Sequence, residues 1–289
     1  MTLALDHIVI AVHDLEQTMA DYGALGFTVL RGGDHPGRST HNALVVFADG
    51  SYLELIAWRA PAPQERWWQL LQRHGEGIVD YALLPPQGTA STVAGAAQRG
   101  LQLEGPLDGG RLRPDGERLQ WQTARPATPD LPFLCGDLTP RTLRVPEGPA
   151  RVHANGAQGV ASLAVAVHDL HATLARYRAL LGDGADLSPP VVFPGSGVRG
   201  AVVRIGTSAL VLASPRDPVG GPSSALAQRL ATRGEGPYAF VLHTHDAAQT
   251  SAPLHAARAH GALIEFELVE AKGGVPEARH DLRGTHIDN

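Results

Sequence analysis

The sequence predicts an α+β fold of four βαβββ units, paired into two tandem domains. Three observations support this prediction: the length, an internal repeat, and short apolar runs that alternate with helical patterns. The chain has 289 residues, whereas domains most often hold about 100 to 150 residues. Its hydrophobic share of 43% allows packed cores and argues against wholesale disorder.

The internal repeat extends over half of the chain. AVHDL, at residues 11–15, recurs at residues 166–170, an offset of 155. GEG, at residues 75–77, recurs at residues 234–236, an offset of 159. Two matches at nearly equal offsets indicate that a whole half has been duplicated.

We expect the boundary between the halves in the Pro-rich stretch from Pro140 to Pro149, which is typical of a linker. This assigns residues 1–147 to an N-terminal domain that holds the candidate site. Residues 157–289 form the C-terminal domain.

The first unit begins with the apolar, β-branched segment HIVIAV, which predicts a strand. Asp14 follows as the expected N-cap of a helix whose buried stripe includes Met19 and Tyr22. Asp169 stands at the same place in the third unit. Three short apolar runs separated by turn residues complete the first unit as strands: FTVLRGG, NALVVFADG and SYLELIAW.

The other units follow the same order. After Glu65, a linking helix leads to the strand GIVDYALLPP, the helix TASTVAGAAQRG and the strands LQLEG, RLQWQTARP and LPFLCGDL. The third unit covers residues 160–214. The fourth runs from Tyr238 to the end, with a helix in AAQTSAPLHAARAHG. The sequence ends with HDLRGTHIDN, so whether this unit has a final strand is left open.

Charge and cysteine content narrow the functional classes. The net charge is -5 and no run of Lys or Arg could track phosphates, so nucleic acid is not an expected partner. Cys135 is the only cysteine, which excludes an intramolecular disulfide and a Cys-based zinc cluster and fits a reducing compartment. No segment approaches about 20 uninterrupted apolar residues, and no signal-peptide pattern is present. We therefore expect a cytoplasmic protein with no membrane partner.

Five segments carry a resemblance to a known superfamily: DHIVIAVHDL, STHNALVVFADGSYLELIAW, RPDGERLQWQ, LPFLCGD and HANGAQGVASLAVAVHDL. In this order they make the chain similar to the vicinal oxygen chelate superfamily, and more narrowly to its glyoxalase-like domain proteins. The resemblance implies cupped sheets, with a divalent metal (Zn, Ni, Mn or Fe) held in a cup by His or Glu side chains. A small-molecule substrate would bind that metal. The superfamily's reactions vary widely, so the fold does not choose one.

The candidate site residues lie in the N-terminal half. His7 is at the start of the first strand, where the resemblance places a metal ligand, although a strand-end hydrogen bond would account for it equally well. Glu54 interrupts the apolar run SYLELIAW, where an ionised carboxylate is costly unless it is paired or metal-bound. It matches the family's last-strand Glu and is our candidate catalytic residue. His41 is the expected third ligand, giving a two-His-one-carboxylate set, but it and Asn42 can equally hold a turn.

The second unit departs from the superfamily pattern. The place equivalent to His7 falls near Asp80 or Tyr81, and the place equivalent to Glu54 falls in PFLC. This argues against a full four-ligand set. Cys135 reads as a buried small hydrophobe rather than a nucleophile.

The C-terminal half departs further. Ser162 takes the place of the first ligand, and Leu210 or Val211 takes that of the carboxylate. We therefore expect no metal in this cup. His243 and His245, two apart on one strand, point the same way and leave a different metal site open.

Two functions from different classes remain open at this stage. One is a divalent-metal-dependent lyase, isomerase or oxygenase that acts on a small molecule, and the other is a non-catalytic binding or sequestering protein. A homodimer is compatible with either. Shared coordination predicts that side-chain atoms of His7 and Glu54 lie roughly 3 to 4 Å apart, since each would be about 2.0 to 2.2 Å from the metal.

Overall fold

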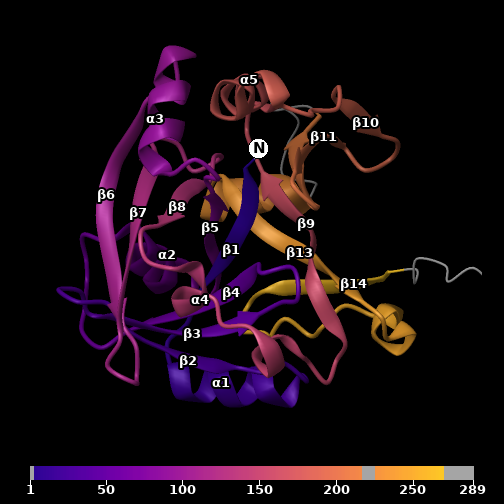
Figure 1. Ribbon diagram of the computed structural model, residues 1–289. Helices are drawn as coiled ribbons and strands as arrows, with labels where there is room; N and C mark the ends of the chain where they lie inside the picture. The colour runs from indigo at the N-terminus through magenta and orange to yellow at the C-terminus, as the bar shows by residue number, and fades with distance from the viewer. Residues whose placement is uncertain (1–2, 217–224, 270–289) are drawn as a thin grey trace, which may run out of the picture.

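The computed structural model describes residues 3–216 and 225–269. These residues form two β-sheets, an eight-stranded closed barrel in the N-terminal half and a six-stranded sheet in the C-terminal half (Figure 1). Among the described residues, no helix is both long and apolar enough to cross a membrane.

The N-terminal half contains two complete βαβββ units. The first consists of β1 (Ala4–Ala11), α1 (Leu15–Ala24), β2 (Leu30–Asp34), β3 (Thr40–Val46) and β4 (Tyr52–Trp58). After α2 (Arg66–His74), the second consists of β5 (Gly77–Leu84), α3 (Thr89–Gln98), β6 (Leu103–Leu112), β7 (Arg118–Pro126) and β8 (Phe133–Asp137). Asp14 caps α1 as expected, since its side chain accepts a hydrogen bond from the backbone N–H of Gln17.

The two units close into a barrel with the strand order β1-β4-β3-β2-β6-β7-β8-β5. β1 runs parallel to β4 and antiparallel to β5, and β2 meets β6 where Asp34 pairs with Leu112. Side chains alternate along a strand, so His7 and Val9 point into the barrel while Ile8 points outward.

The C-terminal half follows two short helices, α4 (Arg141–Arg144) and η1 (Gly148–Arg151). Its first unit consists of β9 (Ala157–Ala166), α5 (Leu170–Leu181), η2 (Gly182–Gly184), β10 (Val191–Phe193), β11 (Val198–Ile205) and β12 (Ser208–Pro215). Then come α6 (Ala225–Arg233), β13 (Gly236–Thr244), η3 (Ala247–Ser251) and β14 (Leu263–Leu268). The strand order is β10-β11-β12-β9-β13-β14.

The α+β class and the two-sheet architecture confirm the fold prediction. The fourth unit differs from it. Where the sequence predicts a helix over residues 247–261, the structure has the short η3 followed by turns. Pro253 lies in the middle of this segment, and proline removes a helical hydrogen bond and clashes with the preceding turn. HDLRGTHIDN, at residues 280–289, lies outside the described residues.

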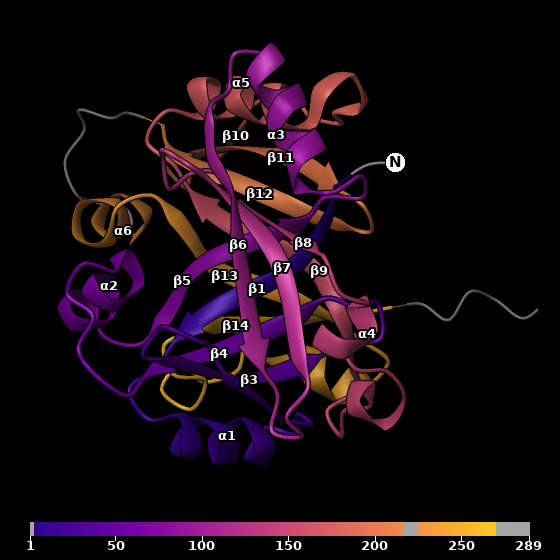
Figure 2. The ribbon, with the colours of Figure 1, turned by 60° about the vertical axis from the view of Figure 1, so that its left-hand side comes forward.

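One hydrophobic core joins the outside of the barrel to the C-terminal sheet. Ile8 and Ile10 of β1 belong to the same buried cluster as Leu163 of β9. The hydroxyl groups of Tyr81 on β5 and Tyr177 on α5 are hydrogen-bonded to each other. The outer face of the barrel therefore packs against one face of the C-terminal sheet. In Figure 2, β6 and β7 of the barrel lie in front and the C-terminal strands lie behind them.

Candidate functional site

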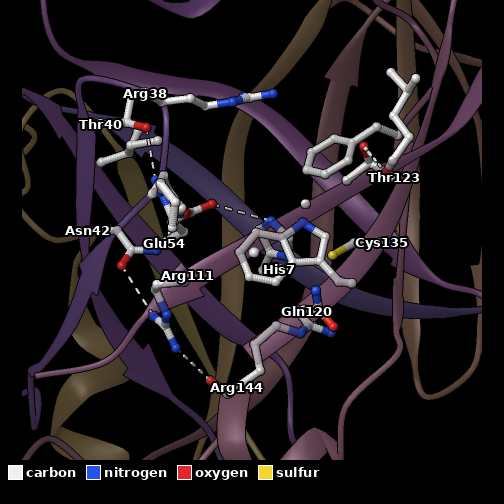
Figure 3. Close-up of a pocket in the computed structure, with 18 of the residues that line it drawn as sticks. His7, Arg38, Thr40, Asn42, Glu54, Arg111, Gln120, Thr123, Cys135 and Arg144 are labelled. Carbon is white, nitrogen blue, oxygen red and sulfur yellow. Dashed lines mark hydrogen bonds and ion pairs between the residues drawn. The ribbon is translucent and has the colours of Figure 1, made fainter. Parts of the chain in front are cut away.

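A cavity of about 320 Å³ lies inside the N-terminal barrel (Figure 3). Three kinds of side chain line it: a group of two histidines and a carboxylate, a set of arginines, and apolar or aromatic residues. The first group is His7, His35 and Glu54; the apolar wall includes Ile56, Trp67, Leu107, Trp121 and Phe133.

His7 and Glu54 meet in this cavity. Val9 of β1 pairs with Glu54 of β4, so His7, two residues earlier on β1, lies diagonally across from the carboxylate on the interior face. The His7 Nε2 to Glu54 Oε2 distance is 3.4 Å. This is within the range that the sequence analysis set for two neighbouring ligands, and it is also the distance of an ion pair.

A buried network fixes the His7 ring from behind. Its Nδ1 lies 2.7 Å from Oδ2 of Asp6, which is fully buried. Arg144 Nη1 donates to the same carboxylate at 2.6 Å, and Arg141 Nη1 donates to its other oxygen at 2.7 Å. The ring stacks on Tyr52, with centroids 4.6 Å apart. The helix α4, which the sequence analysis treated as part of a linker, thus supports the site.

These contacts decide the charge of the pair. Burial alone would lower the pKa of His7, but hydrogen bonds to Asp6 and Glu54 outweigh it and raise that pKa. Burial alone would raise the pKa of Glu54, but the hydrogen bond and charge of His7, with smaller contributions from His35 and Asn42, lower it to about 2. The contacts therefore keep Glu54 ionised at neutral pH and favour the protonated form of His7 beside it.

His35 is the second histidine of the cavity, and the sequence analysis missed it. Its Nε2 lies 3.8 Å from Glu54 Oε1, and its Nδ1 lies 2.8 Å from Thr40 Oγ1. Burial lowers the pKa of His35, so this ring is neutral where His7 is charged. The two rings face different oxygens of one carboxylate and have opposite protonation preferences.

His41 does not join this group, contrary to our expectation. Asn42 lines the cavity, and strand alternation puts His41 on the other face of β3. There the charges of Arg59 and Glu16 act on it. Asn42 takes its place beside Glu54, because its Nδ2 donates to Glu54 Oε1 at 2.7 Å.

Arg111 orients that asparagine. Its Nη1 donates to Asn42 Oδ1 at 3.2 Å, and its Nη2 to the backbone carbonyl of Arg144 at 3.4 Å. The Nε of Arg111 is buried and has no hydrogen-bond partner among the described residues. A buried donor without a partner is costly unless something else accepts from it.

The arginines give the cavity wall its charge. Five arginines and three carboxylates line it, and Arg144 is the arginine that is paired with Asp6 and Asp137. The remaining four form no ion pair with a carboxylate of the described residues: Arg38, Arg111, Arg118 and Arg125. Of the carboxylates, Glu65 accepts a hydrogen bond from Trp58 and Asp108 accepts one from Gln122. The wall therefore carries an excess of positive charge.

The second unit supplies no ligand where the superfamily pattern would place one. Asp80 accepts hydrogen bonds from Arg66 and Trp67, each at 2.9 Å. On β8, Phe133 and Cys135 line the cavity. Burial raises the pKa of the Cys135 thiol, so it stays protonated.

The donor set does not fit a resident divalent cation. His7 and His35 both lie beside Glu54, but in residues 3–216 and 225–269 no group of three or more His, Cys, Asp or Glu side chains is arranged so that it could hold a metal ion. The unpaired arginines of the wall also oppose a cation, since like charges in a partly buried site repel strongly. Anions suit the same wall.

The C-terminal sheet lacks both central residues. Ser162 and Val211 stand at the positions of His7 and Glu54. His243 is paired with Glu267, with its Nε2 atom 3.1 Å from Glu267 Oε1. Chemistry based on these side chains is therefore confined to the barrel.

The glyoxalase-like domain model matches residues 5–181, which is more than half of the chain. The protein therefore belongs to the glyoxalase-like domain family, within the vicinal oxygen chelate superfamily. No curated protein matches the sequence.

Solved structures show the same fold at low identity. A hypothetical protein from Staphylococcus aureus matches with a TM-score of 0.67 and 13% identity, over 92% of this chain and 100% of that one. A variant of 4-hydroxymandelate synthase from Streptomyces coelicolor matches with a TM-score of 0.56 and 18% identity, over 85% of this chain and 72% of that one. A fusion protein of a xylose isomerase-like TIM barrel and 4-hydroxyphenylpyruvate dioxygenase matches with a TM-score of 0.53 and 19% identity, over 85% of this chain and 37% of that one. These likenesses concern the fold alone.

Proposed function

We propose that the N-terminal barrel binds a small organic anion and exchanges protons with it, as an isomerase or lyase. The observation that carries the proposal is the set of four cavity arginines without a carboxylate partner. A carboxylate or similar anion would neutralise this excess charge and accept the free Nε–H of Arg111. The proposal assigns no role to a metal.

The apolar wall indicates the rest of the molecule. Trp67, Trp121 and Phe133 line the cavity, and the guanidinium of Arg125 lies 5.2 Å from the centroid of Trp67 and 5.7 Å from that of Phe133. Flat rings of this kind bind aromatic or other planar groups well. An aryl-substituted carboxylate satisfies both the arginines and the rings.

The two histidines supply an acid and a base. Two titratable groups whose surroundings shift their pKa values apart are the usual sign of such a division of roles. Neutral His35 would accept a proton from a carbon next to a carbonyl group of the ligand, and protonated His7 would return one. Glu54 stays ionised and holds both rings. The ligand loses one proton to His35 and gains one from His7, and the two rings return to their starting protonation states by exchanging protons with solvent.

The test uses aryl-substituted 2-oxo acids, which carry an acidic carbon next to the carbonyl, and their primary amides. Incubation with the full-length protein in deuterated water, followed by proton NMR, should show accelerated exchange of that carbon's protons. His35→Asn should slow the exchange by about 10²- to 10⁴-fold. His41→Asn, which alters a histidine outside the cavity, should leave it unchanged.

Two results would contradict the proposal in different ways. Tight binding of the acids without any exchange would favour the non-catalytic binding protein. Equal affinities for the acids and their amides would show that the cavity has no anion-binding site.

A further inference from the structure

The C-terminal sheet repeats the strand order of the barrel's first unit, but among the described residues no second set of strands closes over the equivalent face. Ser162 and Val211 correspond to His7 and Glu54 by strand pairing. In the barrel, strands of the second unit cover this face and both side chains are buried. In the C-terminal sheet, both positions stay accessible to solvent within the described part of the chain.

Strand pairing aligns ten side chains of this open face in two rows. The first row crosses five strands in the order Arg204, Ala209, Ser162, Val241 and Glu265. The second row runs alongside it in the order Val202, Val211, Ala164, Ala239 and Leu263. We call these ten residues the open sheet face.

The centre of the open sheet face is apolar. Apart from Ser162 and the two charged ends, its members are alanine, valine or leucine, and Leu263 is 46% exposed. Each of the ten is at least partly accessible to solvent in residues 3–216 and 225–269. A contiguous apolar patch with a polar rim is typical of a protein interface.

The two ends of the first row carry opposite charges. Arg204 has a side chain that is 68% exposed, with its nearest carboxylate, Asp186, at 3.8 Å. Glu265, at the other end of the same row, is exposed and forms no ion pair with a described residue. At roughly 4.8 Å between strands, the two ends lie about 19 Å apart, on opposite sides of the row's centre at Ser162.

We propose that the open sheet face binds the same face of a second copy of this chain in a two-fold dimer. A two-fold axis near Ser162 places Arg204 of each copy over Glu265 of the partner subunit, so that one row provides two ion pairs. A two-fold interface must be self-complementary in this way. Two sheets packed face to face, about 10 Å apart, would bury the alanines and valines between these pairs.

The test is a charge-reversal cycle on the full-length protein, followed by sedimentation velocity. The wild-type chain of 30.5 kDa should sediment as a dimer of twice this mass. Arg204→Glu and Glu265→Arg should each raise the dimer dissociation constant at least tenfold, because each places like charges opposite one another. The double variant should regain the wild-type dissociation constant.

Two further variants complete the cycle. Val211→Glu places a carboxylate in the middle of the apolar centre and should give a monomer. Arg178→Glu makes the same charge change as Arg204→Glu on the exposed side of α5, away from the open sheet face, and should remain dimeric. Circular dichroism checks that each variant is folded.

A wild-type chain that is monomeric at every concentration would overturn the proposal. A dimer whose dissociation constant is unchanged by both Arg204→Glu and Glu265→Arg would also overturn it, because the interface would then lie elsewhere.

Discussion

In the N-terminal half, β5 to β8 close over the interior face of β1 and β4 and enclose His7 and Glu54. In the C-terminal half, no second set of strands covers the corresponding face of β9 and β12 within residues 3–216 and 225–269, and this face carries Ser162 and Val211. The strand order of the unit is the same in both halves, β1-β4-β3-β2 in the first and β9-β12-β11-β10 in the second. Closure by the second unit is what buries His7 and Glu54 together inside the barrel.

Closure matters because it changes the electrostatics of the enclosed groups. Inside the barrel a carboxylate, two histidines and several arginines lie in a medium where charges interact more strongly than in water. The opposite pKa shifts of His7 and His35 follow from that burial and from their different partners. An open sheet face would leave such groups near their ordinary pKa values.

Asp6→Asn should cause the largest loss of stability. The Asp6 carboxylate is fully buried beneath the site and accepts from His7, Arg141 and Arg144. Among the described residues, Asp137 and Glu54 then remain as the only carboxylates beside these three cations, and removing one partner of a buried ion pair costs about 3 to 5 kcal/mol. Urea denaturation monitored by circular dichroism measures it. Glu16→Gln, which breaks an exposed pair with Arg31, should show no comparable loss; equal losses would mean that the network does not support the barrel.

Glu54→Gln should make the free energy of unfolding depend less on pH in the acidic range. The pKa of Glu54 is about 2 in the folded protein against 4.5 as the ordinary value, so its contribution is present above pH 4.5 and is lost as the pH falls toward 2. A shift of that size corresponds to about 3 kcal/mol. The raised pKa of His7 acts on the other side, where its contribution is lost as the pH rises through that folded-state value. Denaturation at a series of pH values checks both limbs.

The matched control for that profile is Glu117→Gln, because Glu117 is an exposed carboxylate on the turn between β6 and β7. It should keep the wild-type acid limb. An unchanged acid limb in Glu54→Gln itself would show that Glu54 is not held ionised by its neighbours.

Arg118→Gln should weaken the binding of an aryl carboxylate without unfolding the barrel. Hydrogen bonds to a charged group contribute about 1.5 to 3 kcal/mol, which corresponds to a loss of roughly tenfold or more in affinity. Isothermal titration calorimetry measures it. Arg178→Gln, on α5, should bind as the wild type does, and a loss of equal size there would point to a nonspecific effect of net charge.

Ser162→Ala should have the smallest effect. It alters the C-terminal counterpart of His7, so binding and proton exchange in the barrel should not change. The free energy of unfolding should stay within about 0.5 kcal/mol of the wild-type value. A clear loss of exchange would show that the two halves do not function separately.

Much of the fold could be predicted from the sequence, because the repeats and the alternation of apolar residues are local signals. Glu54 was found by a local signal too, since a carboxylate inside an apolar strand requires a partner. His41 was not excluded, because the choice between His41 and Asn42 depends on strand register. Leu44 pairs with Glu54, which puts Asn42 on the cavity side of β3, and no sequence pattern fixes that pairing.

His35 and the arginines were missed for a related reason. His35 lies just after β2, in the polar segment GGDHPG, which reads as an ordinary turn. Arg111 and Arg118 come from β6 and β7 and reach the cavity only because the second unit closes the barrel. Long-range closure brings these groups together, and a single sequence carries no signal for it.

In the proposed function, the enclosed site recognises an anion and does not depend on a bound metal. The most direct measurement titrates chelator-treated and untreated protein with an aryl 2-oxo acid and its amide by calorimetry, alongside elemental analysis of the same samples. We predict one saturable site for the acid, at least tenfold weaker binding of the amide, and identical affinities before and after chelation. A divalent metal present at one ion per chain, whose removal abolishes binding, would contradict the account.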